Sequence, residues 1–412
     1  MQNKVWRVGV TWSVFTLTLG CAANTRDAGE RPDSDSEFAA TAPSLIEVRG
    51  RVLKRREDWS DQEFQRILEE GRSDLPSDTP EVLAAQLRAH VMVNGHYYIE
   101  LEPDIELATK ILTEPSPPPT DGQAPREERT ILGTDNRTHW TGALSDWPGR
   151  GVGFNNTGGT GVKVAAHSML TAAHVVYDTM DLPNGWYCGD GTVGNNCSTS
   201  PSWRFGVAGT NGFTPWTANY CWSVWVTSGF MYANSSSSFW EVSRWDYAVI
   251  DTSACSDGNT GWYGTAIKTD QQLGNLNVYV LGYPDRATCP ANSYGGDGSA
   301  SAGTDCPGTG PWPESTWRLT GAPGSVNYTG AQLWQGSDSS VTVGDVYPDQ
   351  TLKSNVDITY GDSGAALDWQ PIGGGHYVIG VSSQMEPSYN VFNRFTNEVY
   401  GFLQAHTPFP QP

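Results

Sequence analysis

From residue 131 onward the chain is a series of short apolar runs, separated by clusters of glycine, asparagine, proline and serine. The runs include VKVAA, WSVWV, YAVID, NVYVLGY and HYVIGVSS. Short runs bounded by turn-forming residues are typical of strands in a β-sandwich or β-barrel. Only NEVYGFLQAH, near the C-terminus, has helical spacing, with Val399, Phe402 and Leu403 on one face. We therefore expect an all-β domain that ends in a helix.

Residues 46–112 have a different character. In SDQEFQRILEEGR the apolar residues recur at helical spacing, and Ser60 with Glu63 forms a capping-box pattern. PEVLAAQLRAH predicts a second short helix, and HYYIELEP predicts a strand. Residues 113–130, TEPSPPPTDGQAPREERT, are rich in proline and charge, so we expect an exposed linker that is readily cut. A small α+β module thus precedes the all-β domain.

The first residues have the layout of a secretory signal peptide. Lys4 and Arg7 precede an apolar run that ends at Leu19 and is too short for a confident membrane span of ~20 residues. Gly20-Cys21 resembles a lipoprotein cleavage site, although Thr18 stands where such sites prefer an aliphatic residue. Cleavage near Ala22, without lipidation, is the alternative.

Composition excludes some partners. The 412 residues carry a net charge of −20, and 38% of them are hydrophobic while 17% are charged. This acidic balance argues against nucleic acid and against anionic membrane surfaces as partners, and the hydrophobic content allows a folded core.

The cysteines point to disulfides. Apart from Cys21 there are six of them, an even number in a chain expected to be exported. Fifteen pairings are possible, and we expect sequential neighbours to pair. No short-spaced pair of cysteines or histidines supports a metal site. The expected pairs are Cys188–Cys197, Cys221–Cys255 and Cys289–Cys306.

Three short stretches carry residues suited to nucleophilic catalysis. In chain order they are MLTAAHVVYD with His174, SRWDYAVID with Asp246, and ITYGDSGAAL with Ser363. A serine hydroxyl needs an adjacent base at neutral pH, and that base needs a carboxylate to fix its tautomer and to stabilise the imidazolium. We therefore interpret Ser363 as the nucleophile, His174 as the base and Asp246 as the carboxylate that orients it.

The glycines around Ser363 fit the same chemistry. An acyl-transfer oxyanion needs two backbone N–H groups that converge on one point. Glycine permits the unusual backbone that this requires, so we expect the N–H groups of Gly361 and Ser363 to form the oxyanion hole. Gly364 leaves room beside the nucleophile. The other histidines have no comparable setting and receive no role: His90, His96, His139, His167, His376 and His406.

Together, TAAH, the strand DYAVI and GDSG resemble the chymotrypsin-fold serine peptidases, and the bacterial glutamyl-endopeptidase-like (staphylococcal type) branch more closely than the animal digestive enzymes. TILGTDNRT, GGTGVKVAAHSMLTAAHVV, NVYVLGYP and NRFTNEVYGFL extend the resemblance over residues 130 to about 405. It implies two perpendicular antiparallel β-barrels with the triad in the cleft between them. The implied organisation is a signal peptide at 1–23, a tether, propeptide and activation linker at 24–129, and a peptidase domain at 130–412.

The resemblance leaves substrate preference open. Glutamyl-specific members carry a histidine after the VIGV-type strand, where this chain has Ser382 or Ser383. Asp357 lies six residues before Ser363, the offset of the carboxylate that binds Arg or Lys in trypsin-like enzymes, but the same pattern recurs in the bacterial branch without that specificity. Phe392 stands near the expected wall of the pocket and would narrow it.

Activation by cleavage is implied as well. The family-like start favours a cut after Arg129 that exposes Thr130, with a cut before Ile131 as the alternative. Asp362 is then the carboxylate expected to receive the new α-ammonium group. No metal or organic cofactor is expected.

The overall expectation is a monomeric serine endopeptidase that acts on polypeptides, made as a zymogen and either secreted or lipid-anchored in the bacterial cell envelope. One alternative is a non-catalytic binding module on the same fold. Another is an esterase that uses the same triad, although the lipase-type G-x-S-x-G elbow is absent.

Overall fold

The computed structural model describes the following residues: 42–117, 138–139, 148–155, 159–178, 185–188, 193–197, 203–205, 216–218, 223–236, 239–253, 261–273, 276–283, 334–338, 341–344, 347, 349–354, 356, 358, 362–371, 374–386 and 389–410. No helix in these residues is long and apolar enough to cross a membrane.

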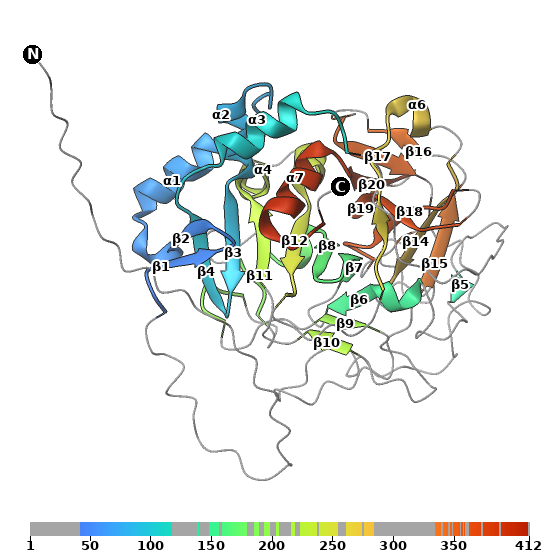
Figure 1. The fold of residues 1–412 in the computed structure, drawn as a ribbon, viewed down its shortest axis with the longest axis horizontal. Helices are drawn as coiled ribbons and strands as arrows, with labels where there is room; N and C mark the ends of the chain where they lie inside the picture. Colours follow the sequence, from blue (N-terminus) through green and yellow to red (C-terminus); the bar gives the residue numbers. More distant parts are fainter. Residues whose placement is uncertain are drawn as a thin grey trace, which may run out of the picture.

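Residues 42–117, called the N-terminal segment below, form a small sheet with helices beside it (Figure 1). The predicted capping box is present in α1, where Ser60 Oγ accepts a bond from the Glu63 N–H and the Glu63 carboxylate accepts one from the Ser60 N–H. Thr79 and Asp104 cap the next two helices by a single bond each, in which the side chain accepts a backbone N–H of the first turn. The elements are β1 (Leu45–Val48), β2 (Arg51–Arg55), η1 (Arg56–Asp58), α1 (Asp61–Glu70), α2 (Pro80–Leu87), β3 (Ala89–Val93), β4 (His96–Glu100) and α3 (Ile105–Thr113).

The first large sheet joins the N-terminal segment to the rest of the chain. Among the described residues it has eleven strands, in the spatial order β1-β2-β4-β3-β11-β12-β8-β7-β6-β9-β10. Strand β3 pairs antiparallel with β11, so the sheet crosses the boundary at residue 130 that the sequence suggested. The strands not yet defined are β6 (Val152–Asn155), β7 (Thr160–Ala165), β8 (Ser168–Thr171), β9 (Trp203–Phe205), β10 (Trp216–Ala218), β11 (Ser223–Thr227) and β12 (Ala248–Asp251).

The second sheet lies on the other side of the molecule, where most of its strands are orange or red in Figure 1. Nine strands of the described chain belong to it, with β16-β17-β20-β19-β18-β14-β15-β5 in line and β13 paired parallel with β19. The strands are β5 (Thr138–His139), β13 (Gly264–Thr265), β14 (Val278–Gly282), β15 (Trp334–Asp338), β16 (Val341–Val343), β17 (Thr351–Ser354), β18 (Ala366–Trp369), β19 (Tyr377–Glu386) and β20 (Tyr389–Arg394).

The predicted fold class is confirmed: the chain is mostly β, with two antiparallel sheets, few helices and the C-terminal helix α7 (Asn397–His406). Thr396 caps α7, whose Val399, Phe402 and Leu403 are buried as the spacing predicted. One apolar cluster runs from the N-terminal segment through the first sheet to α7, and a smaller one fills the second sheet.

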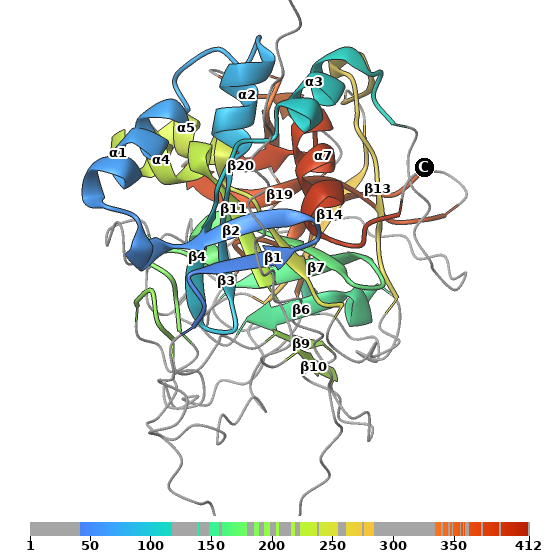
Figure 2. The same cartoon turned by 60° about the vertical axis from the view of Figure 1, so that its left-hand side comes forward.

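The expectation that the all-β part has a single helix is wrong. Helices α4 (Ser228–Ser236) and α5 (Phe239–Trp245) connect β11 to β12, and α6 (Asp270–Leu273) precedes β14, with short 3-10 turns at η2 (Gly149–Gly151) and η3 (Ala173–Val175). Helices α1 and α2 pack on α4, and Figure 2 shows all four of α1, α2, α4 and α5 together. Tertiary packing therefore stabilises α4 and α5, and these helices can form without a local apolar period in the sequence.

Candidate active site

His174 lies directly after β8, in the short turn η3. The two alanines before it, Ala172 and Ala173, are fully buried, and the small side chains let the turn pack closely against the sheet. The imidazole of His174 keeps 31% of its surface exposed, so this side chain reaches solvent while its backbone is held.

Asp246 lies between α5 and β12 and has no exposure to solvent. Its Oδ1 accepts the backbone N–H of His174 at 2.9 Å, and its Oδ2 lies 2.7 Å from His174 Nδ1. An ionised carboxylate only accepts hydrogen bonds, so the proton of this contact sits on Nδ1. The other ring nitrogen, Nε2, is then an acceptor, as a general base requires.

Electrostatics around His174 favour its protonated form. Burial lowers the pKa of His174, but the negative charge of Asp246 and the hydrogen bond to it raise the pKa by more, so that the net pKa lies above the ordinary value. A base with a raised pKa accepts a proton more readily. The pair can therefore take up a proton and stabilise the resulting imidazolium.

Ser383 makes a third contact with this pair that the sequence did not predict. Its Oγ donates to Asp246 Oδ2 at 2.6 Å, and the side chain is 5% exposed. The register of β19 against β20 shifts between Ser382 and Gln384, and such a bulge re-aims side chains. Two adjacent serines in an apolar strand were the available signal, but the sequence reasoning placed them in the substrate pocket.

Ser363 lies in the loop before β18 and is partly exposed. The N–H of Thr160, in β7, donates to the Ser363 carbonyl at 2.8 Å, and the N–H of Gly364 donates to the Ser382 carbonyl at 2.9 Å. Gly364 has φ +83°, and a Cβ there would lie 2.9 Å from the Ala172 nitrogen. The loop therefore packs directly on the residues that lead to His174.

Asp362 is almost fully buried, at 3% exposure. Its carboxylate lies over Gly282 of β14, where a Cβ would come within 2.1 Å of Asp362 Oδ1. Only a glycine fits beneath this carboxylate. The proposed cleavage residues Arg129, Thr130 and Ile131 lie outside the described residues, so the expected contact of Asp362 with a new α-ammonium group stays a prediction.

The residues predicted for substrate recognition are described only in part. Ser382 is 1% exposed and lies opposite Phe392, which is fully buried in the apolar cluster of the second sheet. Gly361, expected in the oxyanion hole, and Asp357 lie outside the described residues. The oxyanion hole and the specificity pocket therefore stay predictions.

Cys188 and Cys197 form a disulfide, with their Cα atoms 5.2 Å apart. Cys21 and the other four cysteines, Cys221, Cys255, Cys289 and Cys306, lie outside the described residues. Within the described chain, no group of three or more histidine, cysteine, aspartate or glutamate side chains is arranged to hold a metal ion.

Comparison with known proteins finds no matching family model and no matching curated protein. Among solved structures, a glutamyl endopeptidase in complex with MPD is 21% identical over 67% of this chain and 98% of that chain, with a TM-score of 0.41. The protease Anisep from Arthrobacter nicotinovorans is 15% identical over 66% of this chain and 99% of that one, with a TM-score of 0.37. A thermostable serine protease from an extremophilic microorganism is 15% identical over 62% and 97%, with a TM-score of 0.32. At these identities and TM-scores the matches do not assign an activity to this chain.

Proposed function

We propose that the protein is a serine endopeptidase that hydrolyses peptide bonds through an acyl-enzyme. The observation that carries the proposal is the buried Asp246, which binds both the backbone and the ring of His174 beside the loop of Ser363. In the proposed reaction Ser363 Oγ attacks the scissile carbonyl, and His174 Nε2 takes its proton. His174 then gives that proton to the leaving amine, and water releases the acyl group by the same steps in reverse order.

Protein groups would stabilise both charges that develop in this reaction, the imidazolium and the oxyanion. Asp246 stabilises the imidazolium of His174, and Ser383 holds Asp246 from the second sheet. The oxyanion would accept the N–H groups of Gly361 and Ser363, which is the role that the sequence predicted for them.

A histidine–aspartate pair alone does not carry this proposal, because the chain has a second one. His376 Nδ1 lies 2.5 Å from Asp368 Oδ2, in the hairpin of β18 and β19. Asp368 also accepts the backbone N–H of Tyr377 and the side-chain amide of Gln370, which is the pattern of a turn-stabilising carboxylate. What sets His174 apart is the serine loop packed on its own turn.

The experiment is active-site labelling with a fluorophosphonate, followed by digestion of a peptide library. We expect the processed wild-type protein to be labelled and the Ser363→Ala protein not to be. Absence of labelling in the wild type would favour the non-catalytic binding module. Labelling with hydrolysis of esters but of no peptide would favour the esterase. His376→Gln is the control, and we expect its labelling to match the wild type.

The library digest also tests the pocket. Cleavage after Arg or Lys would support Asp357 as the recognition carboxylate. Cleavage after Glu would contradict the reasoning that glutamyl specificity needs a histidine where this chain has Ser382 or Ser383.

Export and processing belong to the same proposal. Mass spectrometry of the mature protein would distinguish a lipidated Cys21 from a cut near Ala22, and a new N-terminus at Thr130 from one at Ile131.

A further inference from the structure

The N-terminal segment is bound to the rest of the chain by continuous sheet pairing. Strand β3 pairs with β11 over five residues, from Ala89 opposite Thr227 to Val93 opposite Ser223. Without β3 that side of β11 would be an open edge of unpaired N–H and C=O groups. Added strands bind through such main-chain bonds. We propose that the N-terminal segment stays bound after the stretch 118–137 is cut, as a second subunit that positions Asp246 and His174.

Buried polar side chains cross the same contact. His90 has no exposure, and its Nε2 lies 2.8 Å from Ser228 Oγ while its Nδ1 lies 2.6 Å from the Tyr97 hydroxyl. Burial lowers the pKa of His90 to about 3, so the imidazole is neutral and compatible with this apolar setting. A buried group that loses its partner costs about 1–3 kcal/mol.

Further polar contacts are made with α5. Ser73, which is fully buried, hydrogen-bonds to the carboxylate of Glu241. Arg244 donates to the Ser73 carbonyl at 2.9 Å and to Ser77 Oγ at 2.5 Å. Glu241 and Arg244 are each only 7% exposed. Departure of the segment would remove these partners from two buried charged side chains, which is costly.

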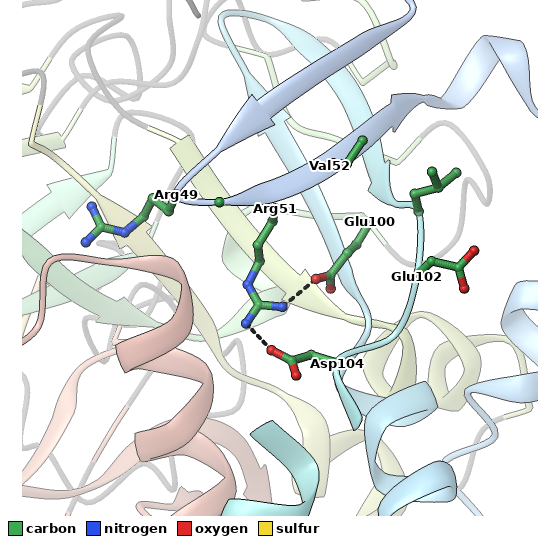
Figure 3. Close-up of a pocket in the computed structure, with 8 residues that line it drawn as sticks. Arg49, Arg51, Val52, Glu100, Glu102 and Asp104 are labelled. Carbon is green, nitrogen blue, oxygen red and sulfur yellow. Dashed lines mark hydrogen bonds and ion pairs between the residues drawn. The ribbon is translucent and has the colours of Figure 1, made fainter. Parts of the chain in front are cut away.

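The turn between β1 and β2 adds an ion pair. Arg49 lies at this turn and reaches Asp251, at the end of β12, with a distance of 3.2 Å. Figure 3 shows that Arg51 points elsewhere, to Glu100 and Asp104 within the segment. The guanidinium of Arg49 is therefore the one that the turn directs to the rest of the molecule.

Close packing adds to the contact between the N-terminal segment and the rest of the chain at two places. Helix α3 packs on α7, where a Cβ at Gly401 would lie 2.6 Å from Ile111 Cδ1. Gly71, after α1, approaches Ser228 so closely that a Cβ would come within 2.5 Å of Ser228 Cβ. Loss of the segment would uncover part of the large apolar cluster, a surface that monomeric proteins avoid.

Contacts of the N-terminal segment continue to the neighbourhood of both His174 and Asp246. Arg244 precedes Asp246 by two residues, so Ser73 and Ser77 hold the end of the helix that delivers the carboxylate. On the other side, the Tyr97 ring packs edge-on against Trp186, with centroids 5.6 Å apart, and Trp186 packs against Tyr177 at 5.2 Å. Tyr177 follows His174 by three residues.

Retention is tested on the full chain with Ser363→Ala and with residues 121–126 replaced by the recognition sequence of a site-specific protease. After cutting, we expect both fragments to elute from size-exclusion chromatography in one peak at the position of the uncut protein. Elution of the small fragment by itself, at micromolar concentration, would overturn the proposal. Because this variant lacks the proposed nucleophile, the outcome does not depend on whether the protein is a peptidase.

The positioning role rests on the proposed function and is tested by kinetics. Ser77→Ala removes one acceptor from Arg244, and we expect kcat to fall about 3- to 10-fold with KM unchanged. Thr109→Ala, on the exposed face of α3, is the matched control and should leave both constants unchanged. Tyr97→Leu removes the ring that packs on Trp186 and serves as the second variant. Wild-type kcat in both Ser77→Ala and Tyr97→Leu would overturn the positioning role.

Discussion

Replacing Ser383 by alanine removes one of three hydrogen bonds to a carboxylate that has no exposure to solvent. The Ser383 hydroxyl donates to Asp246 Oδ2 at 2.6 Å, while the two bonds from His174 remain. A hydrogen bond to a charged group is worth about 1.5–3 kcal/mol, and more of this is lost when the group is buried. We therefore expect the free energy of unfolding to fall by about 1.5–3 kcal/mol in Ser383→Ala.

The same substitution should change how strongly His174 holds a proton. The Ser383 hydroxyl offsets part of the negative charge on Asp246 Oδ2, which is also the atom that His174 Nδ1 contacts. Without it the carboxylate attracts the imidazolium more strongly, so the pKa of His174 should rise further above its ordinary value. The pH at which kcat/KM reaches half of its plateau should therefore move upward.

Ser382→Ala is the matched control for stability. Its hydroxyl is buried, at 1% exposure, and has no hydrogen-bond partner in the described part of the chain. Removing an unsatisfied hydroxyl should leave stability within about 1 kcal/mol of the wild type. The assay is urea unfolding followed by tryptophan fluorescence, with a pH–rate profile for each variant. Equal stability losses in the two variants, or a downward shift of the pH midpoint in Ser383→Ala, would refute the reasoning.

Three further results are expected. Gly364→Ala should lose more stability in urea unfolding than Gly374→Ala, although both glycines have positive φ. A Cβ at Gly364 would lie 2.1 Å from the Thr160 carbonyl oxygen, whereas a Cβ at Gly374 would meet nothing within 4 Å. Equal losses would contradict the packing of the serine loop. Because the pKa of His174 is raised, the rate of hydrolysis should reach half of its maximum above pH ~6.5. The stability that the pair with Asp246 contributes should be full below pH ~6.5 and be lost as the pH rises through the raised pKa. A rate profile with its midpoint below pH ~6.5 would contradict the raised pKa. Since the pKa of His90 is lowered to about 3, stability should decline as the pH falls from ~6.5 toward that value, and His90→Gln should show a shallower decline by the same unfolding assay; an unchanged slope would count against a neutral buried imidazole.

The parts of the fold that could be predicted are those with a local signal. The strand of Ala248–Asp251 and the helix of Asn397–His406 follow from runs whose spacing matches one secondary structure. The contact of His174 with Asp246 was predicted from the chemistry that a serine nucleophile needs and from the resemblance to a peptidase family. The chemistry of the residue types then limited what the pair could do.

The parts that could not be predicted depend on contacts between distant residues. Helix α4 has no strong apolar period, and it lies where α1 and α2 pack on it, while α5 packs on α4. The pairing of β3 with β11 joins residues more than a hundred positions apart, and the sequence offers no sign of which edge a strand will cover. The contact of Ser383 with Asp246 could not be predicted, because a bulge decides where the Ser383 side chain points and a bulge has no clear signature in a single sequence.

The candidate site exists only where the two sheets meet. Asp246 accepts bonds from His174 beside the first sheet and from Ser383 in the second. The loop of Ser363 is held in the same way, by Thr160 on one side and by the Ser382 carbonyl on the other. A shift of one sheet against the other would therefore disturb His174, Asp246 and the loop of Ser363 together. Because the N-terminal segment extends the first sheet and its Ser73 and Ser77 bind Arg244 just before Asp246, we expect its docking and the assembly of the site to be coupled.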